Sequence, residues 1–282
     1  MTMTRRGIGL AVGVNAVDPG SYSGWEGRLR ACEADATAIA ALGREQGFEM
    51  TTLLTAAATR AALLAALERA AGELRAGDIY LLSYAGHGGQ VPDRNGDDAD
   101  YRDETWCLYD GELIDDELHQ QLAMFAAGVR VLVLSDSCHS GTVIRQSGDA
   151  PPAGELPAAP AATESGLVSR AMPDDVAVRT YQEHRDFYGG LQQGIPDDIT
   201  AQIGATVRLI SACQDRQVAI DGPDHGLFTG TLLRVWNQGA FAGTYRDLHA
   251  AIERLMPPTQ TPNHLVLGAA NASFDAEKPF TI

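Results

Sequence analysis

The stretch Val131-Leu132-Val133-Leu134-Ser135-Asp136-Ser137-Cys138-His139-Ser140-Gly141 decides the fold. Its four consecutive valine and leucine residues predict a strand that is buried on both faces. The apolar run then ends abruptly in small and polar residues. Open α/β sheets place their chemistry where parallel strands end, so Cys138 lies where a reactive side chain is expected.

A second segment of the same design precedes this one. Residues 78–84 (DIYLLSY) predict another buried strand, which runs into Ala85-Gly86-His87-Gly88-Gly89. His87 and Cys138 therefore hold the same relative place on two strands, 51 residues apart. If the strands are neighbours, an imidazole and a thiol meet at one edge of the sheet. A cysteine nucleophile with a histidine partner requires that arrangement.

The order of the other predicted elements indicates an α/β fold. Strands and helices alternate from the first residues onward, and the pattern returns near the C-terminus. Strands are predicted at 7–14, 48–54, 206–210 and 264–267, and helices at 29–47, 59–74, 228–238 and 245–255. Such alternation predicts a mostly parallel central sheet of about six strands, with helices on both faces. A short hairpin is predicted over 105–114, and Asp115 or Asp116 is expected to cap the helix that follows it.

The chain is expected to form one domain, 1–282, in three parts. Residues 1–142 carry His87 and Cys138, and residues 206–282 complete the sheet. Between them, residues 143–205 predict a flexible Pro/Ala-rich insert or processing linker, because residues 142–204 hold six of the 13 prolines.

Composition excludes several classes of function. A net charge of −16 argues against nucleic acid or an anionic membrane surface as a partner, and suits cationic peptides or a divalent cation. The four cysteines are widely spaced in the sequence, and this spacing fits neither a zinc site nor a disulfide framework. No signal peptide and no apolar window of membrane-spanning length is present, so a reducing cytoplasm is expected, where Cys138 stays a thiol.

The expected chemistry is an attack by the Cys138 sulfur on a carbonyl carbon. His87 would move a proton to the leaving group, and the backbone N–H groups of Gly88 and Cys138 would bind the oxyanion. His139 is a rival base, but neighbouring residues on an extended chain point to opposite sides, which favours His87. The alternative is a structural pair, a buried cysteine and a core histidine with no catalytic role.

The residues around this pair resemble a known family. Tyr84-Ala85-Gly86-His87-Gly88 and Asp136-Ser137-Cys138-His139-Ser140-Gly141 resemble the two signatures of the metacaspases, and more closely those of their prokaryotic relatives, the orthocaspases of caspase family C14. The separation agrees with the roughly 50 residues known between histidine and cysteine in caspases. Further similar segments are 31–36, 103–104, 114–118, 211–215, 226–229 and 260–263.

The resemblance implies a caspase-like fold and a monomeric cysteine endopeptidase that cuts protein or peptide substrates after Arg or Lys, not after Asp. Asp35 and Asp136 would form the pocket for the basic residue, since carboxylates in a partly enclosed pocket select a cationic side chain. The alternative for Asp35 is a solvated helix carboxylate. Ala85 stands where the family often has serine, so affinity for the basic residue is expected to be lower, or the Arg/Lys preference altered.

The resemblance also places calcium ligands at Asp103, Asp115 and Asp116, and hard carboxylate oxygens suit Ca²⁺. The fourth ligand of such a site would fall near Arg145, which cannot coordinate a cation. The alternative is an acidic surface that is solvated, or that attracts basic substrates. No other cofactor is expected.

Activation by cleavage is expected within residues 143–205. Arg145, Arg170 and Arg179 lie in or beside this segment, and Leu167-Val168-Ser169-Arg170-Ala171 is predicted to be an exposed cleavage site. Either the enzyme itself or a second protease would cut there. Two other classes of function stay open: a catalytically silent caspase-like module that regulates or scaffolds partners, and a calcium-responsive binding module.

Overall fold

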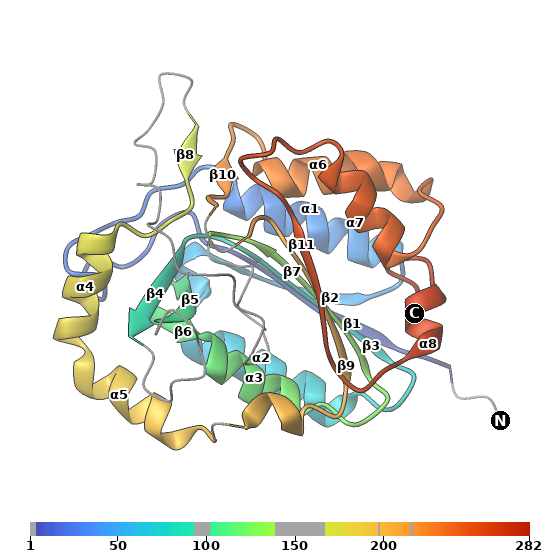
Figure 1. Cartoon of the computed structure of the whole chain (residues 1–282), viewed down its shortest axis with the longest axis horizontal. Coiled ribbons are helices and arrows are strands. Elements are labelled where there is room, and N and C mark those ends of the chain that lie inside the picture. The colour runs from blue at the N-terminus through green and yellow to red at the C-terminus, as the bar shows by residue number, and fades with distance from the viewer. Residues whose placement is uncertain (1–3, 93–101, 139–166, 197, 215–216) are drawn as a thin grey trace.

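The computed structural model describes residues 4–92, 102–138, 167–196, 198–214 and 217–282 (Figure 1). The predictions for His139 and Arg145 lie outside these residues. Within the described part, no helix is long and apolar enough to cross a membrane.

A six-stranded sheet forms the centre of the molecule, in the order β11-β9-β7-β3-β1-β2 (Figure 1). β11 runs antiparallel to β9, and every other neighbouring pair is parallel. The predicted sheet is therefore confirmed. Its strands are β1 (Gly7–Gly13), β2 (Glu49–Leu54), β3 (Ile79–Ala85), β7 (Arg130–Asp136), β9 (Thr206–Ser211) and β11 (Asn263–Gly268).

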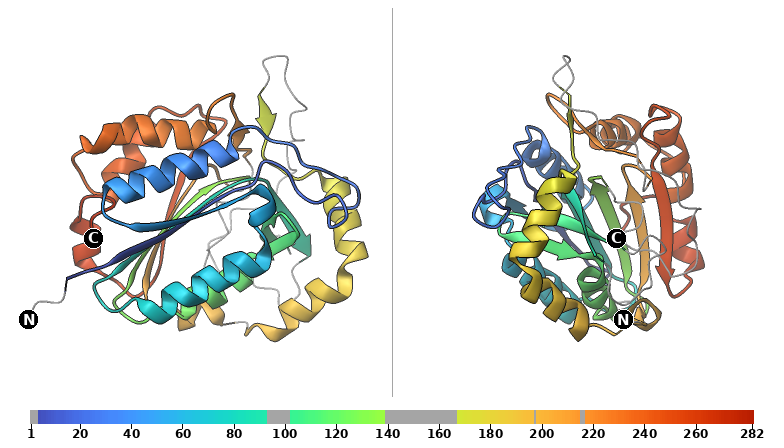
Figure 2. Two further views of the ribbon diagram at one scale, coloured as in Figure 1. Left: turned by 180° about the vertical axis from the view of Figure 1, so that it is seen from behind. Right: turned by 60° about the vertical axis from the view of Figure 1, so that its left-hand side comes forward.

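Helices cover both faces of this sheet (Figures 1 and 2). Alternate side chains of a strand point to opposite faces, and β3 shows the consequence: Tyr80 and Leu82 join one apolar cluster, whereas Leu81 joins the other. The first cluster includes α2 (Arg60–Glu73) and α3 (Asp115–Ala123), and the second includes α1 (Cys32–Glu45), α6 (Leu227–Trp236) and α7 (Tyr245–Glu253). The remaining elements are short: η1 (Thr55–Ala57), η2 (Ile199–Gln202), η3 (Asn237–Gly239), α8 (Ala272–Ala276) and β10 (Ile220–Asp221).

A small antiparallel sheet lies beside the C-terminal ends of the central strands. It has the order β4-β5-β6, made of β4 (Gly88–Pro92), β5 (Arg102–Leu108) and β6 (Gly111–Ile114). The predicted hairpin is β5–β6, whereas β4 was not predicted. The expectation that Asp115 or Asp116 caps α3 is wrong: Ile114 is the N-cap, because its backbone is extended and its N–H donates to Glu117 (3.3 Å).

The described residues 167–196 and 198–205 are largely regular, so the prediction of a flexible, structureless insert over 143–205 is wrong for them. They contain β8 (Val168–Ser169), α4 (Asp174–Glu183) and α5 (Arg185–Gly194). α4 and α5 wrap around the end of the molecule that holds the small sheet (Figure 1). They are anchored by the buried residues Val176, Thr180 and Tyr188, which a proline count does not register.

Candidate active site

His87 and Cys138 follow two adjacent strands. β3 and β7 pair in parallel up to Ala85 and Asp136, so each of the two residues comes two positions after its strand's last pair. Gly88 packs directly on the backbone of Cys138, and a β-carbon at Gly88 would clash with the Cys138 carbonyl oxygen. The predicted convergence of the two strand ends is therefore present, and it requires glycine at position 88.

The Cys138 thiol is fully buried. Its sulfur accepts a hydrogen bond from Ala219 N–H (3.0 Å) and lies 3.9 Å from Ser169 Oγ. Burial raises the pKa of the Cys138 thiol to about 12, although the contacts with Ala219 and Ser169 lower it in part. The sulfur is thus a neutral thiol at physiological pH in this arrangement.

One ring nitrogen of His87 has a hydrogen-bond partner, and the other has none. Its Nε2 lies 3.1 Å from the Gly27 carbonyl oxygen, which can only accept, so Nε2 carries the proton and donates. The Trp25 ring lies 4.6 Å from the imidazole, centroid to centroid. Burial lowers the pKa of His87 to about 4, so the ring is neutral. Nδ1 is buried without a hydrogen-bond partner and is the nitrogen that can accept a proton.

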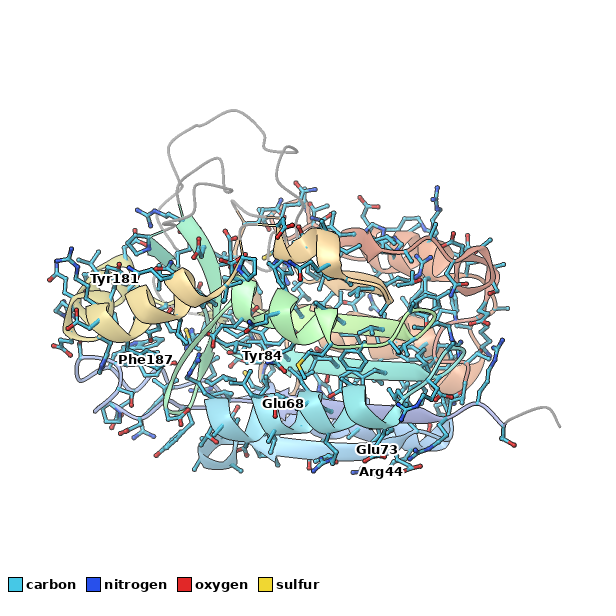
Figure 3. The ribbon with its side chains drawn as sticks, turned by 90° about the horizontal axis from the view of Figure 1, so that it is seen from below. Arg44, Glu68, Glu73, Tyr84, Tyr181 and Phe187 are labelled. Carbon is cyan, nitrogen blue, oxygen red and sulfur yellow. The ribbon has the colours of Figure 1, made fainter. Side chains whose placement is uncertain are left out.

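Tyr84 is a buried side chain (labelled in Figure 3) that supports the His87 backbone. Its hydroxyl is within donating distance of the carbonyl oxygens of His87 (2.8 Å) and Cys107 (3.0 Å). The ring stacks on Trp106 with centroids 4.6 Å apart. This contact fixes the turn that carries the imidazole.

Tyr84→Phe tests that support. The substitution removes one hydroxyl donor that two buried carbonyl oxygens share, and the His87 oxygen keeps another donor, the Cys107 N–H (3.0 Å). The free energy of unfolding is therefore expected to fall by about 1–3 kcal/mol. Urea unfolding followed by circular dichroism measures this, with Tyr109→Phe as the matched control at a half-buried tyrosine. Equal losses in both variants would show that the hydroxyl of Tyr84 supports nothing in particular.

Asp35 and Asp136 meet on one guanidinium, and a third carboxylate joins them. The Arg170 Nη2 lies 2.6 Å from Asp35 and 2.8 Å from Asp221, and Nη1 lies 3.0 Å from Asp136. All four side chains are at most 2% exposed. The alternative of a solvated Asp35 is therefore wrong, and so is the prediction that residues 167–171 are exposed at Arg170.

Backbone and side-chain donors hold each carboxylate in place. Gly226 N–H and His225 Nδ1 contact Asp35 at 3.1 and 2.9 Å. Thr229 donates to Asp136 from its N–H (3.0 Å) and its hydroxyl (2.7 Å). These donors lie outside the segment that carries Arg170, so Asp35 and Asp136 have hydrogen-bond partners besides the guanidinium.

Asp221, on β10, was missed by the sequence analysis. It accepts the N–H groups of Arg30 (2.8 Å) and Ala31 (3.3 Å), just before α1. In the sequence it stands next to Gly222-Pro223, where an aspartate is typical of a turn. Its only signal was its place six residues after the segment 211–215 that resembles the metacaspase pattern.

The segment 168–172 lies in the site as an extended strand. β8 pairs antiparallel with β10, and Arg170 N–H donates to Ala219 O (2.9 Å). Gly88 N–H donates to the Arg170 carbonyl oxygen (2.9 Å), and Met172 N–H donates to Gly88 O (2.8 Å). The carbonyl of Arg170 is therefore bound by one of the two N–H groups expected to form the oxyanion site. Figure 1 shows β8 beside β10.

The other predicted residues lie elsewhere. Arg179 is on the exposed side of α4, where it pairs with Asp175 (2.7 Å). The Asp103 carboxylate accepts a hydrogen bond from Gln192 Nε2 (2.7 Å), and Asp115 and Asp116 lie in the first turn of α3. Across the described residues, no group of three or more His, Cys, Asp or Glu side chains is placed to hold a metal ion. Asp103, Asp115 and Asp116 are not part of such a group among these residues, and both the calcium site and a calcium requirement stay predictions.

A family model for the caspase domain matches residues 6–270. The chain belongs to the caspase-domain family. Curated relatives are fungal metacaspases: Metacaspase-1 of Mycosarcoma maydis is 28% identical over 81% of this chain and 62% of its own length, and Metacaspase-1A of Aspergillus clavatus is 33% identical over 48% and 34%. The chain therefore spans less than two thirds of these relatives.

Solved structures agree with the fold. A crystal structure of a protein from Geobacter sulfurreducens is 52% identical, has a TM-score of 0.85 and covers 98% of both chains. Caspase-1 from Spodoptera frugiperda, at 9% identity, has a TM-score of 0.53 over 94% of this chain and 86% of its own, which shows the shared caspase-like fold.

Proposed function

We propose that this caspase-domain protein is a cysteine endopeptidase that cleaves peptide bonds after Arg or Lys, with Cys138 as nucleophile and His87 as general acid and base. The observation that carries this proposal is the placement of Arg170. Its guanidinium fills a pocket of three carboxylates, and its carbonyl oxygen accepts the Gly88 N–H next to Cys138. A substrate arginine would be held in the same way.

The reaction follows from these contacts. The Cys138 sulfur attacks the carbonyl carbon, its proton passes to His87 Nδ1, and the carbonyl oxygen takes up negative charge against the Gly88 N–H. His87 then protonates the leaving amine as the C–N bond breaks, which leaves a thioester on Cys138. Water attacks that thioester, again with His87 as base, and releases the new carboxylate and the free thiol.

Selectivity for a basic residue follows from the charge of the pocket. Asp35, Asp136 and Asp221 are buried, and a buried carboxylate is costly unless a cation pairs with it. A lysine or arginine side chain supplies that cation, whereas an aspartate would add a fourth negative charge. Asp221 is proposed as the third member of this pocket, beside Asp35 and Asp136.

Self-cleavage is proposed at the Arg170–Ala171 bond. Residues 168–172 already occupy the site in the extended form that a substrate adopts, so an external substrate must displace them. Cleavage of this bond would allow the two new chain ends, at Arg170 and Ala171, to leave the site. Arg179 is less suited, because it lies within α4 and is paired with Asp175.

Fluorogenic peptides with Arg, Lys or Asp before the reporter test the proposed activity, with and without Ca²⁺, on wild type and Cys138→Ala. Release of the reporter from the Arg and Lys peptides by wild type alone is expected. Cleavage of the Asp peptide, or equal cleavage by Cys138→Ala, would contradict the proposal. A change on adding Ca²⁺ would report on the calcium prediction separately.

Alkylation by iodoacetamide tests the state of the thiol in the uncleaved protein. Burial raises the pKa of Cys138 to about 12. At any pH below that value, raising the pH by one unit therefore increases the thiolate fraction about tenfold. The labelling rate of Cys138, followed by peptide mass spectrometry, is therefore expected to rise steeply from pH 7 to pH 10. After self-cleavage, labelling is expected at mildly acidic pH.

The Cys138→Ala variant gives the background from the three other buried cysteines. A rate that is already fast at pH 6 in uncleaved protein would indicate a preformed thiolate–imidazolium pair, contrary to the neutral thiol inferred above.

A further inference from the structure

Met172, the second residue after the bond proposed for cleavage, sits in a recess of its own. Its side chain is 4% exposed, although Ala171 before it is half-buried and Pro173 after it is exposed. The Met172 sulfur lies 3.7 Å from the Cys107 sulfur, and the residue belongs to the apolar cluster that includes Trp106. Arg170 is thus not the only side chain by which this segment is held.

The backbone fixes which residue enters the recess. Gly88 donates its N–H to the Arg170 carbonyl oxygen and accepts the Met172 N–H at its own carbonyl oxygen. One glycine therefore holds the chain on both sides of Ala171. Any peptide bound in this register must point its second residue after the cleaved bond at the place where Met172 lies.

The walls of the recess come from the small sheet and not from the segment that fills it. Gly89 on β4 leaves the room: a β-carbon there would lie 3.1 Å from the Met172 sulfur, 2.9 Å from Thr105 Oγ1 and 2.8 Å from Glu112 Oε2. Cys107 on β5 forms another side. None of these walls belongs to residues 168–172, so an external peptide in the same register would meet the same side chains.

Charge restricts what the recess accepts. Glu112 is fully buried, its Oε2 bonds to Thr105 Oγ1 at 2.5 Å, and its Oε1 has no hydrogen-bond partner. An aspartate brought next to this carboxyl group would be a second buried acid, and Arg60, which contacts the Glu112 carbonyl oxygen, is already paired with Glu117. A serine would make fewer contacts with the apolar cluster that includes Met172. A methionine or leucine side chain makes those contacts.

We infer that the recess formed by Gly89, Cys107 and Glu112 is a second specificity site, which binds an unbranched or leucine-like apolar side chain at the second residue after the cleaved bond. This inference rests on the proposed function, since it concerns substrates of the same site. It defines the preferred substrate class as one with a basic residue before the cleaved bond and an apolar residue at the second position after it.

Internally quenched peptides of the sequence Val-Ser-Arg-Ala-X-Pro-Asp test it, where X is Met, Leu, Ser or Asp. The kcat/KM of the self-cleaved enzyme is expected to be about 10- to 100-fold higher for Met and Leu than for Ser, from the free energy of burying an apolar side chain, and lowest for Asp. Gly89→Ala fills the recess and is expected to lower the Met-to-Ser ratio. Ratios within about twofold of one, in wild type, would overturn the inference.

Two further measurements separate this inference from the proposed function. A reporter directly after arginine has no second residue, so its cleavage tests the proposed function alone. If no peptide is cut, hydrogen exchange in the Cys138→Ala background still decides the inference. Met172→Ser is expected to speed exchange of the 168–172 amides about tenfold or more, and Met172→Leu to leave it near the parent value. Equal exchange rates of these amides in both variants would contradict the inference that the recess selects an apolar side chain.

Discussion

Arg170→Met is expected to lower the free energy of unfolding by roughly 3–5 kcal/mol and to abolish cleavage at position 170. The substitution keeps an apolar chain in the pocket but removes the guanidinium that pairs with all three buried carboxylates. Removing one partner of a buried ion pair leaves an uncompensated charge, and that cost exceeds the worth of the pair itself. Urea unfolding and gel analysis after long incubation give the two readouts.

The loss of unfolding free energy in Arg170→Met is also expected to depend on pH. Burial already raises the pKa of Asp136, and Arg170 is the main influence that lowers it. Without Arg170 that pKa rises further above its unfolded value, so the folded state takes up protons. Stability is then expected to fall as pH rises from the unfolded pKa through the folded one, and the variant should be closer to wild type at pH 5 than at pH 8.

Two control variants sharpen this prediction. Arg170→Lys keeps a positive charge and a cleavable bond, so it should lose less stability and still be cut. Arg179→Met removes an exposed arginine from α4 and is expected to change little. If Arg170→Met is as stable as wild type, or is still cut after residue 170, the three carboxylates do not form the pocket described.

Asp136→Asn is expected to lower kcat/KM for arginine peptides by about 30- to 5,000-fold. Asparagine preserves the size of the side chain but removes one buried charge opposite the guanidinium, and truncating such a pair costs about 2–5 kcal/mol. Peptides with an uncharged glutamine before the reporter should be cut poorly by both enzymes, so the Arg-to-Gln ratio collapses in the variant. Steady-state kinetics on the two peptides measures this ratio.

Asp186→Asn, at an exposed position on α5, is the matched control. A uniform loss on both peptides would assign Asp136 to folding or to general activity and not to recognition of the basic residue.

The central sheet and the place of the site could be predicted from the sequence for a physical reason. Buried parallel strands read as continuous apolar runs, and His87 and Cys138 each follow two residues after the last paired residue of β3 and of β7. That local pattern is sufficient to align His87 with Cys138, because parallel strands carry their C-terminal ends to one edge.

The contents of the pocket could not be predicted in the same way. Arg170 reaches Asp35 across 135 residues and Asp221 across 51, and no local pattern encodes contacts of that kind. Composition also gave a wrong prediction for the described residues 167–196 and 198–205. The prolines and alanines of residues 143–205 indicate a flexible segment, whereas a few buried side chains order α4 and α5. The resemblance to metacaspases predicted Asp35 and Asp136 as pocket residues, whereas the role of Asp221 is evident only from the structure.

The direct test of the account is the N-terminal sequence of the smaller fragment after incubation of the purified protein, compared between wild type and Cys138→Ala. Wild type is predicted to yield a fragment that begins at Ala171, and Cys138→Ala none. The same fragment from both proteins, or a wild-type fragment that begins at any residue not preceded by Arg or Lys, would contradict the account.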